Sequence, residues 1–165
     1  MIKSLKLLVC LLLFVGCGNS QSNEKEKFSY ERTKKDKKEN VVVNHDIKAS
    51  VMVDLVNKGV GPIKEISFDN EINPQLVSSG EEIFSKMCSA CHKVGKKFIG
   101  PKPNKIFDRR TPEWVMNMIL NPEEMVNNDP IAKKLLVEFN GAPMANQNLT
   151  EDEARAVVEY FRTLN

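Results

Sequence analysis

The chain has 165 residues, of which 41% are hydrophobic and 28% are charged, enough for one domain with a modest core and some further segments. Its 24 basic and 22 acidic residues give a formal net charge of +2, which excludes the broad positive field of a nucleic-acid-binding protein. Locally the charge is uneven, because residues 93–110 contain many lysines and arginines but only one acid.

Residues 1–16 have the three parts of a secretory signal peptide. Lys3 and Lys6 precede an apolar run of about nine residues, which is too short to span a bilayer, and small residues follow. The stretch LFVGC at residues 13–17 resembles a bacterial lipoprotein processing box, although Phe14 stands where that pattern usually has leucine. We therefore expect Cys17 to be lipidated and to anchor the protein to a membrane of the bacterial cell envelope, on the periplasmic or other extracytoplasmic side. Ordinary signal cleavage nearby is the alternative.

Residues 17–40 are expected to form a lipidated, disordered tether. The stretch is rich in Asn, Gln, Ser and charged residues, and Phe28 and Tyr30 are its only large apolar residues. Such a composition cannot bury enough surface to offset the entropy lost on ordering.

Residues 41–73 are expected to form an extension packed on the following domain. Ile47, Val51 and Leu55 recur at helical spacing, whereas the valine-rich runs favour strand. The pattern therefore leaves the secondary structure of the extension open.

Residues 74–165 carry clear helix signals. Thr111 and Asp129 each stand as an N-cap residue before a proline, and Thr150 opens a capping box. The predicted helices cover residues 75–87, 112–120 and 130–139, followed by a C-terminal helix that begins at about residue 151. The domain is therefore expected to be all-α.

The sequence Cys88-Ser89-Ala90-Cys91-His92 is a C-x-x-C-H motif. Two thiols at this spacing can add to the two vinyl groups of one porphyrin, and the histidine then lies under the iron as an axial ligand. A redox dithiol or half of a zinc site is the alternative, but the other cysteines, Cys10 and Cys17, lie in the leader. The motif therefore predicts covalently bound haem c.

An electron carrier needs a second axial ligand, and Met144, which follows Pro143, is the strongest candidate. A thioether is a soft ligand that raises the reduction potential, and a proline stiffens the loop that would present it. The competing candidates are Met116, Met118, Met125 and His45. The methionines lie in or beside predicted helices, where core packing is their ordinary role, and the histidine has a polar context.

Residues 75–165 resemble a class I c-type cytochrome, which carries a single haem. Such proteins have a helix leading into C-x-x-C-H, a Gly-Pro pair, a later axial methionine and a C-terminal helix packed across the first. The residues that carry the resemblance are Gly80, Phe84, Cys88, Cys91, His92, Gly100, Pro101, Met144, Tyr160 and Phe161. The resemblance implies that the Pro101 carbonyl accepts a hydrogen bond from the His92 ring. The family pattern does not include residues 17–73.

Three further residues are candidates for haem contacts. Trp114 could donate its indole N–H to a haem propionate, although an aromatic residue on a helix face is more often part of the core. Arg109 and Arg110 could pair with propionates or could lie in a solvated loop.

The basic run after the motif is the candidate docking surface for an acidic redox partner, such as a terminal oxidase or reductase. Its lysines are Lys93, Lys96, Lys97, Lys102 and Lys105, and a merely soluble face is the alternative. We expect an electron carrier of a respiratory chain rather than an enzyme. The alternatives are a haem enzyme or a gas or peroxide sensor with an open axial site, and a module of a larger oxidoreductase.

Overall fold

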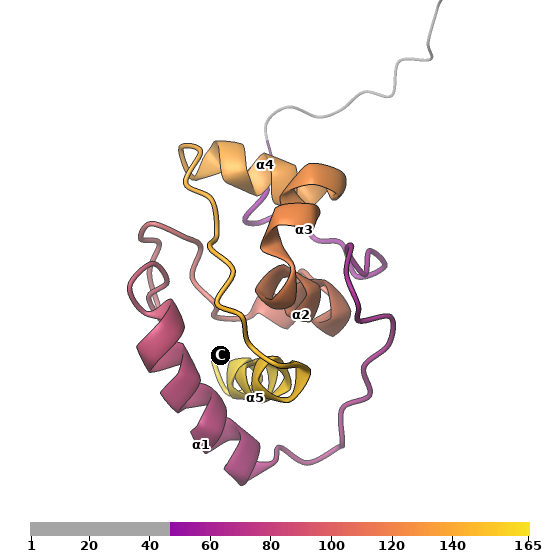
Figure 1. The fold of residues 1–165 in the computed structure, drawn as a ribbon, viewed down its shortest axis with the longest axis vertical. Coiled ribbons are helices and arrows are strands. Elements are labelled where there is room, and N and C mark those ends of the chain that lie inside the picture. Colours follow the sequence, from indigo (N-terminus) through magenta and orange to yellow (C-terminus); the bar gives the residue numbers. More distant parts are fainter. Residues whose placement is uncertain (1–46) are drawn as a thin grey trace, which may run out of the picture. The chain divides into compact units, whose positions relative to one another are not determined.

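Four of the five α-helices in residues 47–165 begin at a proline, whose fixed φ suits the first helical position. A computed structural model describes residues 47–165, which belong to one compact unit (Figure 1). The elements are α1 (Pro74–Ile83), α2 (Pro112–Leu120), α3 (Pro122–Asn128), α4 (Pro130–Glu138), α5 (Glu151–Phe161), a π-helical turn (Phe84–Cys88) and a 3-10 turn (Ile106–Asp108). The all-α fold is confirmed. The expectations for the signal peptide, the tether, Cys17 and His45 lie outside the described residues.

The predicted N-caps are present. The Thr111 hydroxyl accepts a hydrogen bond from the Trp114 backbone N–H at 3.1 Å. The Asp129 carboxylate accepts from two backbone N–H groups at the start of α4, and Thr150 and Glu153 form the capping box of α5. These side chains accept hydrogen bonds from backbone N–H groups that the first turn of a helix would otherwise leave unpaired. For this reason the starts of α2, α4 and α5 could be predicted from the sequence.

Helix α3 was not predicted. The predicted helix over residues 112–120 ends at Asn121, and this residue also serves as the N-cap residue of α3, with Pro122 at its first position. Met125 of α3 is fully buried. No helix in residues 47–165 has the length and apolar content needed to cross a membrane.

Helices α1 and α5 pack closely through Gly80 (Figure 1). A Cβ atom at this position would stand 2.0 Å from the Ala156 carbonyl oxygen, so only glycine allows the two backbones to approach this far. Beyond the crossing, the Phe84 ring lies 5.6 Å from the Tyr160 ring and 5.7 Å from the Phe161 ring, measured between centroids. This packing fixes the direction in which α1 delivers the chain into the C-x-x-C-H motif.

Residues 47–73 form neither helix nor strand and are held by hydrogen bonds to the helical domain. The buried Asn117 amide donates to the carbonyls of Lys58 and Ile63 at 2.9 Å each and accepts from the Ile63 N–H at 2.9 Å. The Arg110 guanidinium donates to the carbonyl of Ala49 at 2.6 Å and to that of Met52. Within residues 47–73 neither the helix predicted by the spacing of Ile47, Val51 and Leu55 nor a strand at residues 51–53 forms, because tertiary contacts set this backbone.

A buried carboxylate ties the end of the extension to α5. Glu159 accepts hydrogen bonds from Arg155 at 2.7 Å, from Arg162 at 2.6 Å and from the Asn73 backbone N–H at 3.0 Å. The two guanidinium groups also stack on the Phe68 ring, 4.8 and 4.5 Å from its centroid. Burial alone would raise the pKa of Glu159, but these hydrogen bonds and charges hold its pKa below the usual value.

Candidate haem-binding site

The C-x-x-C-H motif begins within a π-helical turn at the end of α1. The Ser89 N–H donates to the Phe84 carbonyl, five residues back, at 2.9 Å. The His92 N–H then donates to the Cys88 carbonyl at 2.9 Å, which closes a tight turn around the two cysteines. The wide π turn therefore ends the helix at the first cysteine of the motif. Such turns are frequent at functional sites.

The ring of His92 is fixed by the loop that follows. Its Nδ1 lies 2.8 Å from the Pro101 carbonyl oxygen, and because a carbonyl can only accept, Nδ1 carries the proton. A Cβ atom on Gly100 would lie 2.5 to 2.9 Å from three ring atoms, so a larger residue would push the imidazole away. The arrangement leaves Nε2 as the free nitrogen of a preset ring, as an axial metal ligand requires.

His92 and both cysteines line a cleft with a free space of about 920 Å³, its open mouth included. The lining is mainly apolar and consists of Met87, Cys88, Cys91, His92, Ile99, Gly100, Pro101, Met118, Val126, Ala132, Leu135, Leu136, Phe139, Ala142, Pro143, Met144, Ala145 and Gln147. An apolar slot with two thiols and an oriented imidazole fits haem c.

Met144 also lines this cleft, on the loop between α4 and α5. Left-handed backbone at Asn140 and Gly141 ends α4 and turns the chain back. Of the competing methionines, Met118 also lines the cleft, whereas Met116 and Met125 are buried in the core.

Cys88 is half-buried and Cys91 is exposed. Burial, with a smaller contribution from Cys91, raises the pKa of the Cys88 thiol to about 11. In the haem-free chain Cys88 therefore stays a neutral thiol at physiological pH.

The candidate propionate contacts lie outside the lining of the cleft. The Arg109 guanidinium donates to the carbonyls of Lys102, Asn104 and Lys105. The Arg110 guanidinium donates to carbonyls of the extension and to the carbonyl of Arg109. Trp114 is buried one helical turn before Met118. Two buried donors, the Arg110 Nε and the Trp114 indole nitrogen, have no hydrogen-bond partner within residues 47–165. The Arg110 guanidinium also lies over the Trp114 ring, 5.2 Å from its centroid.

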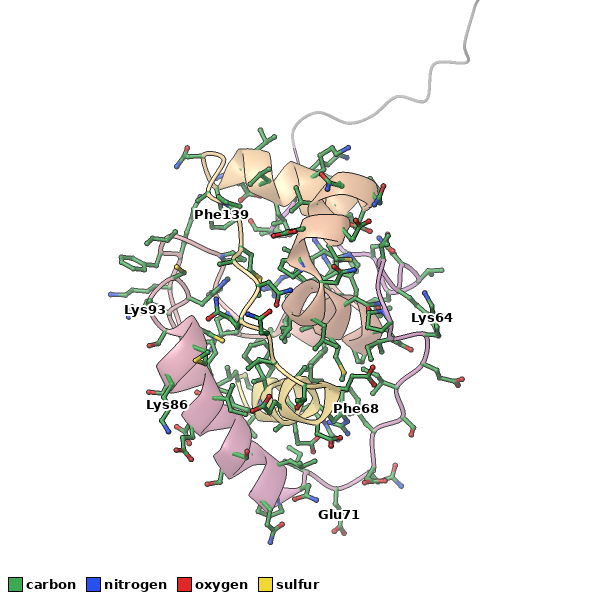
Figure 2. All side chains as sticks on the ribbon, viewed as in Figure 1. Lys64, Phe68, Glu71, Lys86, Lys93 and Phe139 are labelled. Carbon is green, nitrogen blue, oxygen red and sulfur yellow. The ribbon has the colours of Figure 1, made fainter. Side chains whose placement is uncertain are left out.

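One lysine of the run after the motif, Lys97, contacts a residue that lines the cleft. The Lys97 ammonium lies 4.4 Å from the centroid of Phe139, a lining residue, and that of Lys93 lies 5.5 Å from the Phe98 centroid. Figure 2 shows Lys93 and Phe139 on the same side of the molecule, away from Lys64. Four lysines of the run are exposed and Lys93 is half-buried.

The apolar wall contributed by α4 was not predicted as part of the site. Ala132, Leu135, Leu136 and Phe139 line the cleft at spacings of three, four and seven residues. That periodicity is visible in the sequence, but it is equally typical of a helix packed on an ordinary core.

Comparisons with known proteins agree with this geometry. A family model described as cytochrome c matches residues 77–165. A cytochrome c from Rhodothermus marinus is similar, with 38% identity and a TM-score of 0.61 over 63% of this chain and 89% of that chain. An engineered form of it, bound to a carbene intermediate, has 38% identity and a TM-score of 0.58 over 63% of this chain and 89% of that chain. No curated protein matches the chain significantly.

Proposed function

The chain belongs to the cytochrome c family, and on this premise we propose that it carries single electrons between redox proteins of a bacterial respiratory chain while attached to a membrane. Members of the family function in haem-based electron transfer and hold haem c through a cysteine pair, which in this chain is Cys88 and Cys91. The observation that carries the proposal is the preset His92 ring in the same apolar cleft as the two thiols and Met144.

In this proposal His92 and Met144 are the axial ligands. The bound haem supplies an iron that alternates between ferrous and ferric states. The Nδ1–H of His92 donates a hydrogen bond to the Pro101 carbonyl, which leaves Nε2 free to bind the iron and increases the donor strength of the ring. Met144 offers a soft thioether that favours the ferrous state, and the apolar wall of the cleft excludes water.

The two unpartnered donors, Trp114 Nε1 and Arg110 Nε, are the candidate propionate contacts. A buried N–H without a partner costs about 1–3 kcal/mol, so a carboxylate that accepted from both would recover that loss. Arg109 fits this role less well, because backbone carbonyls already accept from its guanidinium.

The lysine run is the docking surface for acidic partners. Electrons transfer efficiently only when a partner comes close to the haem edge, and complementary charge mainly raises the association rate. Lys97, which stacks on Phe139 at the mouth of the cleft, lies where such steering is useful.

The membrane attachment rests on Cys17 and on the signal features of residues 1–16. The lipid-bearing cysteine places the domain on the extracytoplasmic side of a bacterial membrane, where a soluble redox domain can reach partners in that membrane.

Charge reversal tests the electron-transfer role. We expect Lys96→Glu with Lys97→Glu to slow oxidation of the reduced holoprotein by membranes of its own organism about tenfold at low salt. The haem spectrum should be unchanged, and the effect should fade above about 0.15 M salt, where the Debye length falls to about 8 Å. Lys133→Glu with Lys134→Glu, an adjacent exposed pair on α4, is the matched control. Equal rates for wild type and both double variants would refute docking at the lysine run.

A further inference from the structure

The extension carries a patch of exposed apolar side chains outside the haem site. The members of this apolar patch are Ile47, Val51, Val53, Leu55 and Val56. Val53 is 63% exposed and Val56 is 87% exposed. Single exposed apolar residues are normal, but five within ten consecutive residues indicate a surface that something else covers.

The exposure is built into the backbone. Val51, Val53 and Leu55 are exposed whereas Met52 and Asp54 between them are partly buried, the alternation of an extended chain. The Asp54 N–H donates to the Arg109 carbonyl at 3.0 Å. Ser50 donates to Glu138 through both its N–H, at 2.8 Å, and its hydroxyl, at 2.6 Å. The valines therefore cannot turn inward without breaking these contacts.

We propose that the apolar patch rests on the lipid bilayer to which Cys17 anchors the chain, and so orients the haem domain on the membrane. The inference rests on the proposed lipidation of Cys17. Only residues 18–46 separate that cysteine from Ile47, so the patch is the part of the described domain nearest the anchor along the chain. Fully extended, this stretch spans at most about 100 Å, so the anchor confines the patch to a layer of this depth beside the bilayer. The confinement gives the patch a high effective concentration at the lipid surface, where even a weak contact is populated.

The residues beside the patch suit a phospholipid surface. Lys48 is exposed and can lay its stem along the apolar boundary while its ammonium group reaches headgroup phosphates. The Lys58 ammonium is engaged instead by the Glu113 carboxylate, at 3.1 Å, and by the Lys64 carbonyl. The one acid among residues 47–58, Asp54, is partly buried, and its carboxylate accepts hydrogen bonds from the Val56 and Asn57 N–H groups. An apolar surface with a lysine beside it fits a membrane-surface contact.

This orientation leaves the haem edge accessible. No residue of the extension from Ile47 to Asn73 lines the cleft. In Figure 1 the extension runs from beside α4 down the right-hand side, whereas α1 leads into the motif on the left. A domain that rests on the patch keeps the mouth of the cleft and its lysines free for a partner.

Photo-cross-linking in vesicles tests the inference. The mature full-chain holoprotein is reconstituted into vesicles of phosphatidylethanolamine and phosphatidylglycerol that contain a phospholipid with a diazirine on its acyl chain. We expect the lipid cross-links mapped by mass spectrometry to concentrate in residues 47–58. Val53→Glu with Val56→Glu should reduce them at least fivefold without changing the haem spectrum. Val137→Glu replaces a valine on α4 that is 75% exposed and should leave them unchanged.

Flotation of the same vesicles separates the two proposals. If the holoprotein floats with the vesicles but its cross-links fall outside residues 47–58, or persist in the double variant, the patch does not rest on the bilayer. If the double variant keeps the cross-links but exchanges electrons more slowly with native membranes, the patch binds a protein, which also overturns the inference. A holoprotein that does not float shows that the Cys17 anchor itself fails, and the orientation proposal falls with it.

Discussion

Replacing Gly80 by alanine tests whether the close crossing of α1 and α5 sets the stability of the domain. A Cβ atom at this position would stand 2.0 Å from the Ala156 carbonyl oxygen and 2.9 Å from the Val157 nitrogen, whereas ordinary contact begins at 3.4 Å. Because the obstructing atoms belong to the backbone of α5, a side-chain movement cannot relieve the clash, and the helices must separate.

Two opposing effects decide the magnitude. Alanine is favoured over glycine inside a helix by about 1 kcal/mol, while overpacking costs about 1–3 kcal/mol and sometimes more. Since the clash is with backbone, we take the upper end and expect a net loss of about 2 kcal/mol. For a domain of this size such a loss lowers the Tm by roughly 8 °C.

Thermal unfolding of the holoprotein, followed by far-ultraviolet circular dichroism, measures this effect. Ser79→Ala is the matched control, because Ser79 precedes Gly80 in α1 and is exposed, and we expect it to leave the Tm nearly unchanged. A Gly80→Ala protein that melts at or above the wild-type temperature would refute the account of the crossing.

Two further predictions concern titratable groups. In the haem-free protein at pH 8, iodoacetamide should alkylate exposed Cys91 at least about tenfold faster than Cys88. The reason is that a thiol with a pKa of about 11, such as that of Cys88, is ionised at this pH to only about one part in a thousand. Equal alkylation rates of the two cysteines, followed by mass spectrometry, would contradict the burial of Cys88. Folding lowers the pKa of Glu159, so its carboxylate stabilises the protein above its unfolded pKa of about 4.5, and that contribution is lost as the pH falls from about 5 through the folded pKa. Urea unfolding at a series of pH values should therefore show a flatter acid slope for Glu159→Gln, and an unchanged slope would show that the Glu159 network does not titrate on unfolding.

The parts of the fold that sequence could predict are those fixed by local chemistry. The prolines and capping side chains at Thr111, Asp129 and Thr150 satisfy helix starts within a few residues, so their effect is legible without tertiary structure. The C-x-x-C-H motif is equally local. Helix α3 was not predicted because an Asn-Pro pair is equally typical of the end of one helix and of the start of the next.

The extension and the propionate candidates depend on contacts between distant residues. Asn117 and Arg110 hold the extension through carbonyl groups more than fifty residues away, and no local propensity encodes such bonds. The sequence likewise left Trp114 between a core role and a haem contact, and the structure gives it a buried ring with an unpartnered indole nitrogen. When a side chain is held by hydrogen bonds to backbone groups that are distant in the sequence, the hydrophobic periodicity of its own helix does not reveal its role.

The most direct test of the central claim is a redox titration of the purified holoprotein, with and without carbon monoxide. If His92 and Met144 both bind the iron, the wild type should show a single one-electron wave that carbon monoxide does not shift. The same titration of Met144→Ala should give a lower midpoint potential that responds to carbon monoxide. A wild-type midpoint that shifts with carbon monoxide, or a Met144→Ala protein that titrates like the wild type, would contradict Met144 ligation and favour an open axial site or another ligand.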